Sequence, residues 1–145
     1  HPDIITFTNV FAHIEDLSGL LKNLKLLSGD QTMLVIENHY LGAVLTSGQF
    51  DTFYHEHPRT YSLTSFQYIA KNLGVSLLDA QFVSRYGGNI RVYLGHGKPS
   101  NIVKDESRFG LLFDTMNKDL FSWRTETKQL IEMFVKEHGP LRAKA

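Results

Sequence analysis

The sequence predicts an α/β fold that begins with a parallel strand–helix–strand unit, ends its sheet in an antiparallel hairpin, and continues into helices. Two short apolar runs, residues 4–7 and 33–36, flank a stretch with leucines at helical spacing. Two later apolar runs are separated by Gly87 and Gly88, which is the pattern of a hairpin. Beyond residue 100 the apolar residues recur at helical spacing.

Residue types indicate where the strand and the helix of the first unit begin and end. We interpret residues 4–7 as a buried strand, and Asp16 as the N-cap of the helix that follows. The apolar positions of that helix end before Gly29 and are Leu17, Leu20, Leu21, Leu24 and Leu27. Because the chain between the two strands has room only for one helix, the strands should be parallel. In such a sheet a site lies beyond the carboxyl ends of the strands, here residues 9–13 and 37–40.

The following segment predicts a helix and a hairpin. Residues 41–48 are ambiguous between helix and strand. Residues 64–67 have the spacing of a capping box, with Leu63 and Tyr68 placed to staple it, and Gly74 ends the helix. Residues 75–84 then predict a strand, and residues 90–94 a returning strand with Val92 and Leu94 on one face.

A loop at residues 95–100 is the expected domain boundary, which gives one domain at residues 1–96 and a helical one at residues 97–145. The second contains an apolar stripe that we expect to be core. Its members are Leu120, Trp123, Thr127, Leu130, Ile131, Phe134 and Val135.

Composition narrows the classes of function. Fifteen basic and fifteen acidic residues leave a formal net charge of zero, so the sequence lacks the attraction expected of a general nucleic-acid or membrane-surface binder. The chain has no cysteine, which excludes a disulfide and a thiol nucleophile and agrees with a reducing compartment. No apolar run is long enough to span a bilayer. We therefore expect a cytoplasmic protein without nucleic-acid or membrane partners.

One window is unusually dense in groups that can move protons. Residues 49–57, Gln-Phe-Asp-Thr-Phe-Tyr-His-Glu-His, contain a phenol, two imidazoles and two carboxylates. Histidine has the unperturbed pKa nearest neutrality, so it serves readily as acid or base. Pro58 disfavours helix at His57, and a constrained polar loop of this kind is typical of a site.

Four stretches together resemble the sugar C-methyltransferases: Asn-Val-Phe-Ala-His at residues 9–13, the window at residues 49–57, Tyr-Ser-Leu at residues 61–63, and Gly-Gly-Asn-Ile-Arg-Val at residues 87–92. The resemblance covers residues 3–96. It implies a dependence on S-adenosylmethionine, a nucleotide-linked keto-deoxysugar as substrate, and the second half of a class I methyltransferase, or Rossmann-like, sheet. Residues 1–96 would then be the C-terminal half of the methyltransferase domain, and residues 97–145 the helical start of a C-terminal domain.

The resemblance also implies roles for single residues. His57 corresponds to the base that removes the proton next to the ketone, and Tyr54 to the donor for the keto oxygen. Glu56 would orient an imidazole or hold a sugar hydroxyl. His13 corresponds to a further active-site histidine, and Asn9 to a contact with the cofactor. The family's glycine-rich cofactor turn has no counterpart in this sequence, and Thr8 stands where a second asparagine is common, so we expect the chain alone to be inactive.

Two other classes of function remain open. If the loop is extended, His55 and His57 point to one side, and His13 or His39 could complete a metal site. Alternatively, the chain is a non-catalytic interaction module, since half a sheet exposes an edge that invites self-association. The residues also have ordinary structural interpretations: Tyr54 packs, Glu56 is a solvated charge, and Arg91 is a solvated strand residue.

Overall fold

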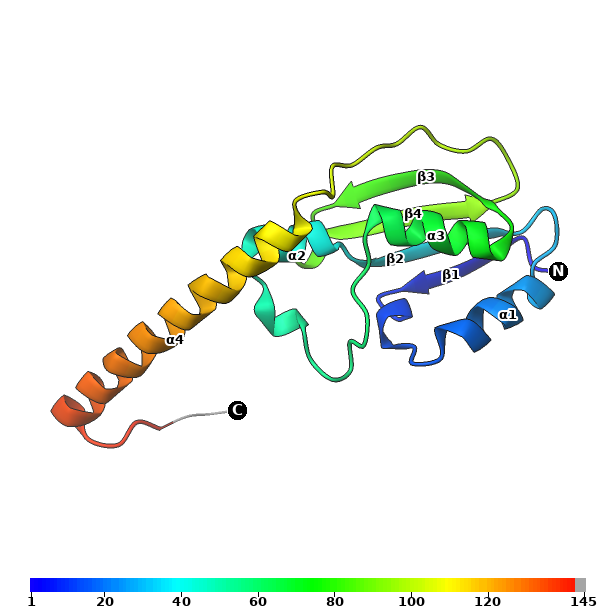
Figure 1. Cartoon of the computed structure of the whole chain (residues 1–145). Coiled ribbons are helices and arrows are strands. Elements are labelled where there is room, and N and C mark those ends of the chain that lie inside the picture. Colours follow the sequence, from blue (N-terminus) through cyan, green and yellow to red (C-terminus); the bar gives the residue numbers. More distant parts are fainter. Residues whose placement is uncertain (143–145) are drawn as a thin grey trace. The chain divides into compact units, whose positions relative to one another are not determined.

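The computed structural model describes residues 1–142, which divide into two compact units, His1–Phe109 and a second that begins at Gly110. Within the described residues, four strands of the first unit form one sheet in the order β1-β2-β4-β3 (Figure 1). The strands are β1 (Ile4–Thr8), β2 (Met33–His39), β3 (Ser76–Val83) and β4 (Asn89–Gly95). Strand β1 is parallel to β2, whereas β4 is antiparallel to both β2 and β3. The predicted parallel unit and hairpin are therefore confirmed.

Two helices, α1 (Leu17–Leu27) and α3 (Leu63–Leu73), lie on the same side of the sheet (Figure 1). Asp16 caps α1 as predicted, with Oδ1 accepting a hydrogen bond of 2.8 Å from the Gly19 amide. The ambiguous stretch forms α2 (Leu41–Ser47), which Gly48 ends in the left-handed conformation at φ 64°. Short 3-10 helices occupy η1 (Phe11–His13), η2 (Phe50–Thr52) and η3 (Arg85–Gly87).

The core forms between this helical layer and one face of the sheet. Leu34 of β2 lies opposite Leu94 of β4, and Ile36 lies opposite Val92, so alternate residues of both strands face α1 and α3. Phe66 of α3 is fully buried against this face. Each such side chain contributes about 1.5–3 kcal/mol by leaving water, which makes this face the source of the unit's stability.

Two predictions for the first unit are wrong in detail. Strand β1 is not buried: it lies at the edge of the sheet, and its first residue, Ile4, is 54% exposed. The capping box of α3 lies two residues earlier than the spacing suggested, because Ser62 is extended and exchanges hydrogen bonds with Ser65. The carboxylate of Glu106 also accepts hydrogen bonds from the first amides of α3, which ties the segment after β4 to this helix.

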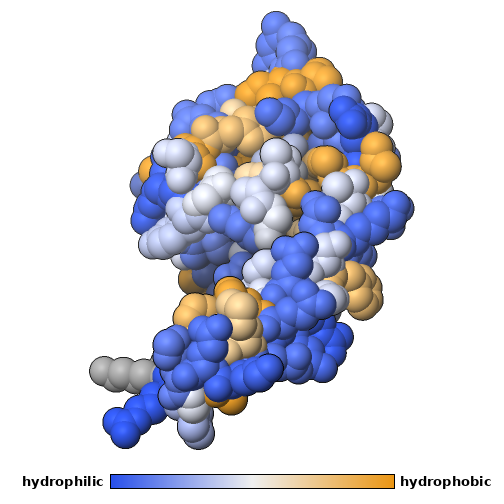
Figure 2. Space-filling view, turned by 90° about the vertical axis from the view of Figure 1, so that its left-hand side faces the viewer, coloured by the Kyte–Doolittle hydropathy of each residue, from blue (hydrophilic) through white to orange (hydrophobic). Residues whose placement is uncertain are grey.

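The second unit is formed mainly by one long helix, α4 (Phe109–His138), of which the first residue belongs to the first unit. The stripe that we expected to be core is exposed: Trp123 is 54% and Leu130 50% accessible. Figure 2 likewise shows hydrophobic side chains reaching the surface among hydrophilic ones. The predicted helix is confirmed, but the predicted burial of its apolar stripe is wrong. An apolar stripe is buried only where a partner surface covers it. The last three residues of the expected second domain, 143–145, lie outside the described residues.

No helix within residues 1–142 combines the length and the apolarity needed to cross a membrane.

Candidate active site

Three histidines meet beyond the carboxyl ends of β1 and β2. His13 belongs to η1, which follows β1, and His39 is the last residue of β2. The loop after α2 brings His57 between them, with its ring centre 4.5 Å from that of His13 and 5.8 Å from that of His39. The edge of the sheet that the sequence indicated is therefore where these side chains gather.

The contacts of His57 determine which of its nitrogens carries the proton. Nδ1 lies 3.0 Å from the backbone carbonyl oxygen of Thr52, which can only accept a hydrogen bond. Nδ1 must therefore hold the hydrogen, and Nε2 of the neutral ring has the free electron pair. Nε2 faces two groups able to donate to it, Nε2 of His13 at 3.2 Å and the Tyr54 hydroxyl at 3.3 Å. This is the arrangement of an oriented general base.

A turn in the loop gives neighbouring residues different surroundings. The amide of His57 donates to the carbonyl oxygen of Tyr54 at 2.9 Å, so the loop is folded rather than extended. Tyr54 and His57 come together on one side, while the His55 side chain is 88% exposed. Glu56 is 60% exposed and lies 3.9 Å from His55. Glu56 therefore does not orient His57.

The folded loop also removes the basis of the metal hypothesis. That hypothesis required His55 and His57 to point to the same side, and they do not. Within residues 1–142, no group of three or more histidine, cysteine or acidic residues has the geometry to hold a metal ion.

His39 is a site residue that the sequence analysis considered only as a metal ligand. Burial, followed by the charges of His57 and His13, lowers the pKa of His39, so its ring stays neutral at pH 7. It also lines, with His57 and Arg59, a cavity of about 10 Å³, roughly the space of one water molecule. Its position at the end of a strand that points toward the site was the signal that could have identified it.

An ion pair between a buried glutamate and a partly exposed arginine lies two residues before His39 in β2. Glu37 of β2 is 3% exposed, and Arg91 of β4 donates to its Oε2 from Nε at 2.8 Å and Nη2 at 2.7 Å. Burial alone would raise the pKa of Glu37, but hydrogen bonds from Asn89 and Arg91 and the charges of Arg91 and Arg85 outweigh it and lower the pKa. Arg91 is therefore not a solvated strand residue, which corrects that interpretation.

Backbone strain is concentrated at the same edge. Among the described residues other than glycine, only Asn9 and Tyr86 have positive φ, at 52° and 50°. Such conformations cost about 1–3 kcal/mol and often mark functional sites. Asn9 follows β1, and its Oδ1 accepts a hydrogen bond of 3.1 Å from Asn89. The side-chain oxygen of the same asparagine, Asn89 Oδ1, is buried and has no hydrogen-bond partner among the described residues.

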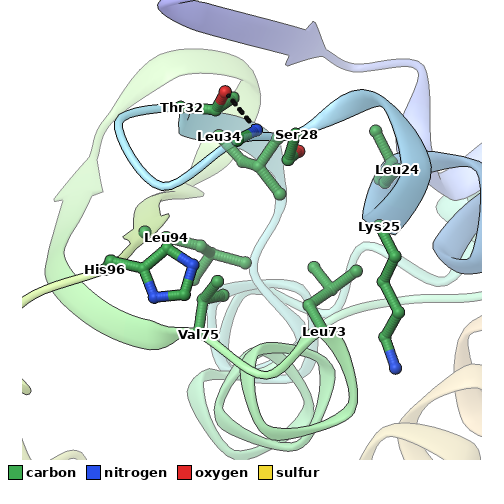
Figure 3. Close-up of a pocket in the computed structure, with 11 residues that line it drawn as sticks. Leu24, Lys25, Ser28, Thr32, Leu34, Leu73, Val75, Leu94 and His96 are labelled. Atoms are coloured by element: carbon green, nitrogen blue, oxygen red, sulfur yellow. Dashed lines mark hydrogen bonds between the residues drawn. The ribbon is translucent and has the colours of Figure 1, made fainter. Parts of the chain in front are cut away.

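A second cavity, of about 280 Å³, lies at the opposite end of the strands (Figure 3). Its walls are about equally polar and apolar, with Leu34 near the start of β2 and Leu94 near the end of β4. Lys25 and His96 are its ionisable side chains, and no carboxylate lines it. It therefore lacks the clustered proton donors and acceptors of the histidine site, which we take as the candidate active site.

Comparison with known proteins relates the chain to methyltransferases. No family model matches the sequence. Over 83 residues, or 57% of this chain, the sequence is 32% identical to the C-methyltransferase NovU of Streptomyces niveus. The matched part is 20% of that protein, so the chain spans about a fifth of the length of the relative. The similarity supports a methyltransferase relationship, with which the mixed α/β sheet is compatible.

Proposed function

We propose that this chain is part of an S-adenosylmethionine-dependent enzyme that methylates the carbon next to a ketone on a nucleotide-linked deoxysugar. The similarity to a C-methyltransferase supports the reaction class. The strand order, with antiparallel β4 between β2 and β3, fits the second half of a class I methyltransferase sheet. The other parts of the enzyme would come from sequence that these 145 residues do not include.

The observation that carries the proposal is the hydrogen bond between His57 Nδ1 and the Thr52 carbonyl oxygen, at 3.0 Å. It leaves Nε2 free to remove a proton. A ketone acidifies the adjacent carbon, so a positioned base can form the enolate. S-adenosylmethionine would supply the methyl group to the enolate carbon, its methyl–sulfur bond breaking as S-adenosylhomocysteine leaves, while the abstracted proton stays on His57 Nε2.

Tyr54 is the donor that we assign to the enolate oxygen. Its hydroxyl lies 3.3 Å from His57 Nε2, and the side chain is 41% exposed, so it borders both the base and solvent. In the free enzyme this hydroxyl competes with His13 for the single electron pair of Nε2. When substrate binds, the hydroxyl turns to the keto oxygen, where negative charge develops.

His13 responds to the protonation of His57. Two Nε2–H groups cannot face each other at 3.2 Å, so His13 must accept once His57 has taken the proton. It does so by carrying its own hydrogen on Nδ1. The pair can therefore pass the proton on toward solvent, since His13 is exposed. Glu56 is 60% exposed, and we assign it to the binding of a sugar hydroxyl.

S-adenosylmethionine supplies an electrophilic methyl group. The chain offers one part of its site, at the end of β1. The side-chain Oδ1 of Asn9 accepts a hydrogen bond from Asn89 Nδ2, so Nδ2 is the side-chain group that Asn9 can offer a ligand. The unpartnered Asn89 Oδ1 nearby is a second polar atom that fits a ligand at this edge. The glycine-rich turn on which cofactor affinity depends has no counterpart here, so calorimetry on the 145-residue chain should show no tight binding.

The test of the function is methyl transfer by the intact protein. It would be incubated with S-adenosylmethionine and a panel of nucleotide-linked keto-deoxysugars, with nucleotide-linked sugars that lack the ketone as the matched control. Mass spectrometry should find one added methyl group on carbon for a keto-sugar and none for the controls. Transfer to the controls, or to an oxygen or nitrogen atom, would refute the enolate mechanism.

A further inference from the structure

The turn between β3 and β4 presents two exposed side chains beside the histidine cluster. Arg85 is 53% exposed and Tyr86 61% exposed. The Tyr86 ring centre lies 6.3 Å from that of His39, which in turn lies 5.8 Å from that of His57. The turn therefore borders the base through one intervening imidazole.

The turn has a backbone conformation that few side chains adopt. Tyr86 is held at φ 50°, and Gly87 and Gly88 follow at φ 80° and 130°. A Cβ atom added to Gly88 would collide with Cβ of Ala43 in α2, so the turn packs closely against that helix. The tyrosine ring is thus kept at the surface by a backbone that costs free energy to maintain, which is typical of a functional position.

The charges beneath the turn do not balance. Glu37 is the carboxylate that this cluster contains, and Arg91 already neutralises it with two hydrogen bonds. Arg85 approaches the same carboxylate only at 3.8 Å, from Nη1. Two guanidinium groups therefore share one carboxylate, and the surplus positive charge belongs to the exposed Arg85. A guanidinium held at one end by a buried acid is well placed to bind an anion at the other.

The aromatic ring beside this charge adds a second type of recognition. The Arg85 guanidinium lies 5.3 Å from the Tyr86 ring centre, a cation–π distance. An exposed ring offers a flat apolar surface on which a nucleobase can stack. Charge and ring together fit a ligand that has both a phosphate and a planar base.

We infer that Arg85 and Tyr86 form the subsite for the nucleoside diphosphate part of the substrate, with Arg85 pairing with a phosphate and Tyr86 stacking on the base. The inference rests on the proposed function, because it takes the sugar to be bound at His57. A diphosphate attached to the sugar extends away from the reacting carbon, and this turn is an anion-binding element that borders the histidines.

Calorimetry with nucleoside diphosphates that lack the sugar tests the subsite without relying on methyl transfer. The intact protein would be titrated with thymidine diphosphate and uridine diphosphate. Arg85→Gln should weaken binding of the better ligand about ten- to hundredfold, the usual effect of a lost charged hydrogen bond. Lys25→Gln is the matched control, since it removes the same charge at the opposite end of the strands, and should change affinity less than about twofold.

The role of the ring is tested separately from the conformation of the turn. Tyr86→Asn removes the ring and tolerates the positive φ, so it should weaken binding by about tenfold, while Tyr86→Phe should bind like the wild type. Equal losses for Arg85→Gln and Lys25→Gln, or no binding of either diphosphate by the wild type, would overturn the inference. Methyl transfer without these binding effects would refute the subsite alone. Binding effects without methyl transfer would refute the proposed function and keep the subsite.

Discussion

The Nδ1 atom of His57 lies 3.0 Å from the carbonyl oxygen of Thr52. The backbone of the loop, and not a carboxylate, therefore orients this imidazole. The loop contains two acidic side chains, Asp51 and Glu56, yet neither contacts His57 within hydrogen-bonding distance. The orientation of His57 consequently depends on the fold of the loop, so mutations of the neighbouring side chains can test their roles one at a time.

Replacing Tyr54 with phenylalanine should lower turnover of the intact enzyme by about tenfold, less than loss of the base. Water can donate to the enolate oxygen in place of the hydroxyl, whereas no neighbour replaces a positioned base, whose loss costs about 10²–10⁴-fold. Steady-state kinetics of Tyr54→Phe and His57→Ala would measure both effects on kcat and KM. A larger loss of kcat in Tyr54→Phe would mean that the phenol, rather than the imidazole, is the group on which proton removal depends.

Replacing Glu37 with glutamine should lower the free energy of unfolding at pH 7 by about 1–3 kcal/mol, because charged hydrogen bonds to Arg91 are lost. The pKa of Glu37 is lowered in the folded state from its ordinary 4.5. Its stabilising effect is therefore complete above pH 4.5 and is lost as the pH falls through the lower, folded-state pKa.

Urea unfolding at several pH values checks this dependence. The difference between wild type and Glu37→Gln should shrink as the pH falls below about 4.5. Glu132→Gln is the control, because Glu132 is 66% exposed in its pair with Lys128 and should have little effect. A difference that stays constant from pH 7 to pH 3 would show that Glu37 acts through shape and not through charge.

The 145-residue chain should self-associate through the open edge of β1. The Met33 amide of β2 donates to the Asp3 carbonyl oxygen, and the Asn9 amide donates to the Glu37 carbonyl oxygen of β2. Alternation therefore places the amides of Ile4, Thr6 and Thr8 toward the unpaired edge of β1. Thr6→Pro removes one of these amides without breaking the β1–β2 ladder, so it should reduce the apparent mass in light scattering while circular dichroism stays unchanged. A wild-type chain that is already monomeric when concentrated would exclude this edge as an interface.

Much of the fold could be predicted because its signals are local. The chain order of elements follows from apolar runs and from boundary signals such as Asp16, which begins a helix, and Gly74, which ends one. The α3 cap was misplaced because Ser62, Thr64 and Ser65 all have hydroxyl groups, and only the backbone decides which is extended. The burial of the α4 stripe was also misjudged, since exposure depends on a partner surface.

The sequence predicted which side chains of the candidate site lie close together, but not how they are oriented. The sequence identified His13, Tyr54 and His57, and the structure brings them together. Only the resemblance distinguished His57 from His55, because the turn that divides them depends on a hydrogen bond between backbone atoms, which the residue types do not reveal. Nor could the sequence reveal the pairing of Arg91 with Glu37, whose positions are opposite each other only once β2 and β4 pair.

Exchange of the acidic sugar proton is the most direct test that His57 is the base. The intact enzyme would be incubated with its keto-sugar nucleotide in heavy water without S-adenosylmethionine, and deuterium at the carbon next to the ketone followed by nuclear magnetic resonance. His57→Ala should slow exchange about 10²–10⁴-fold, while His55→Ala should exchange like the wild type, because His55 faces solvent. Wild-type exchange in His57→Ala together with loss of exchange in His55→Ala would contradict the account.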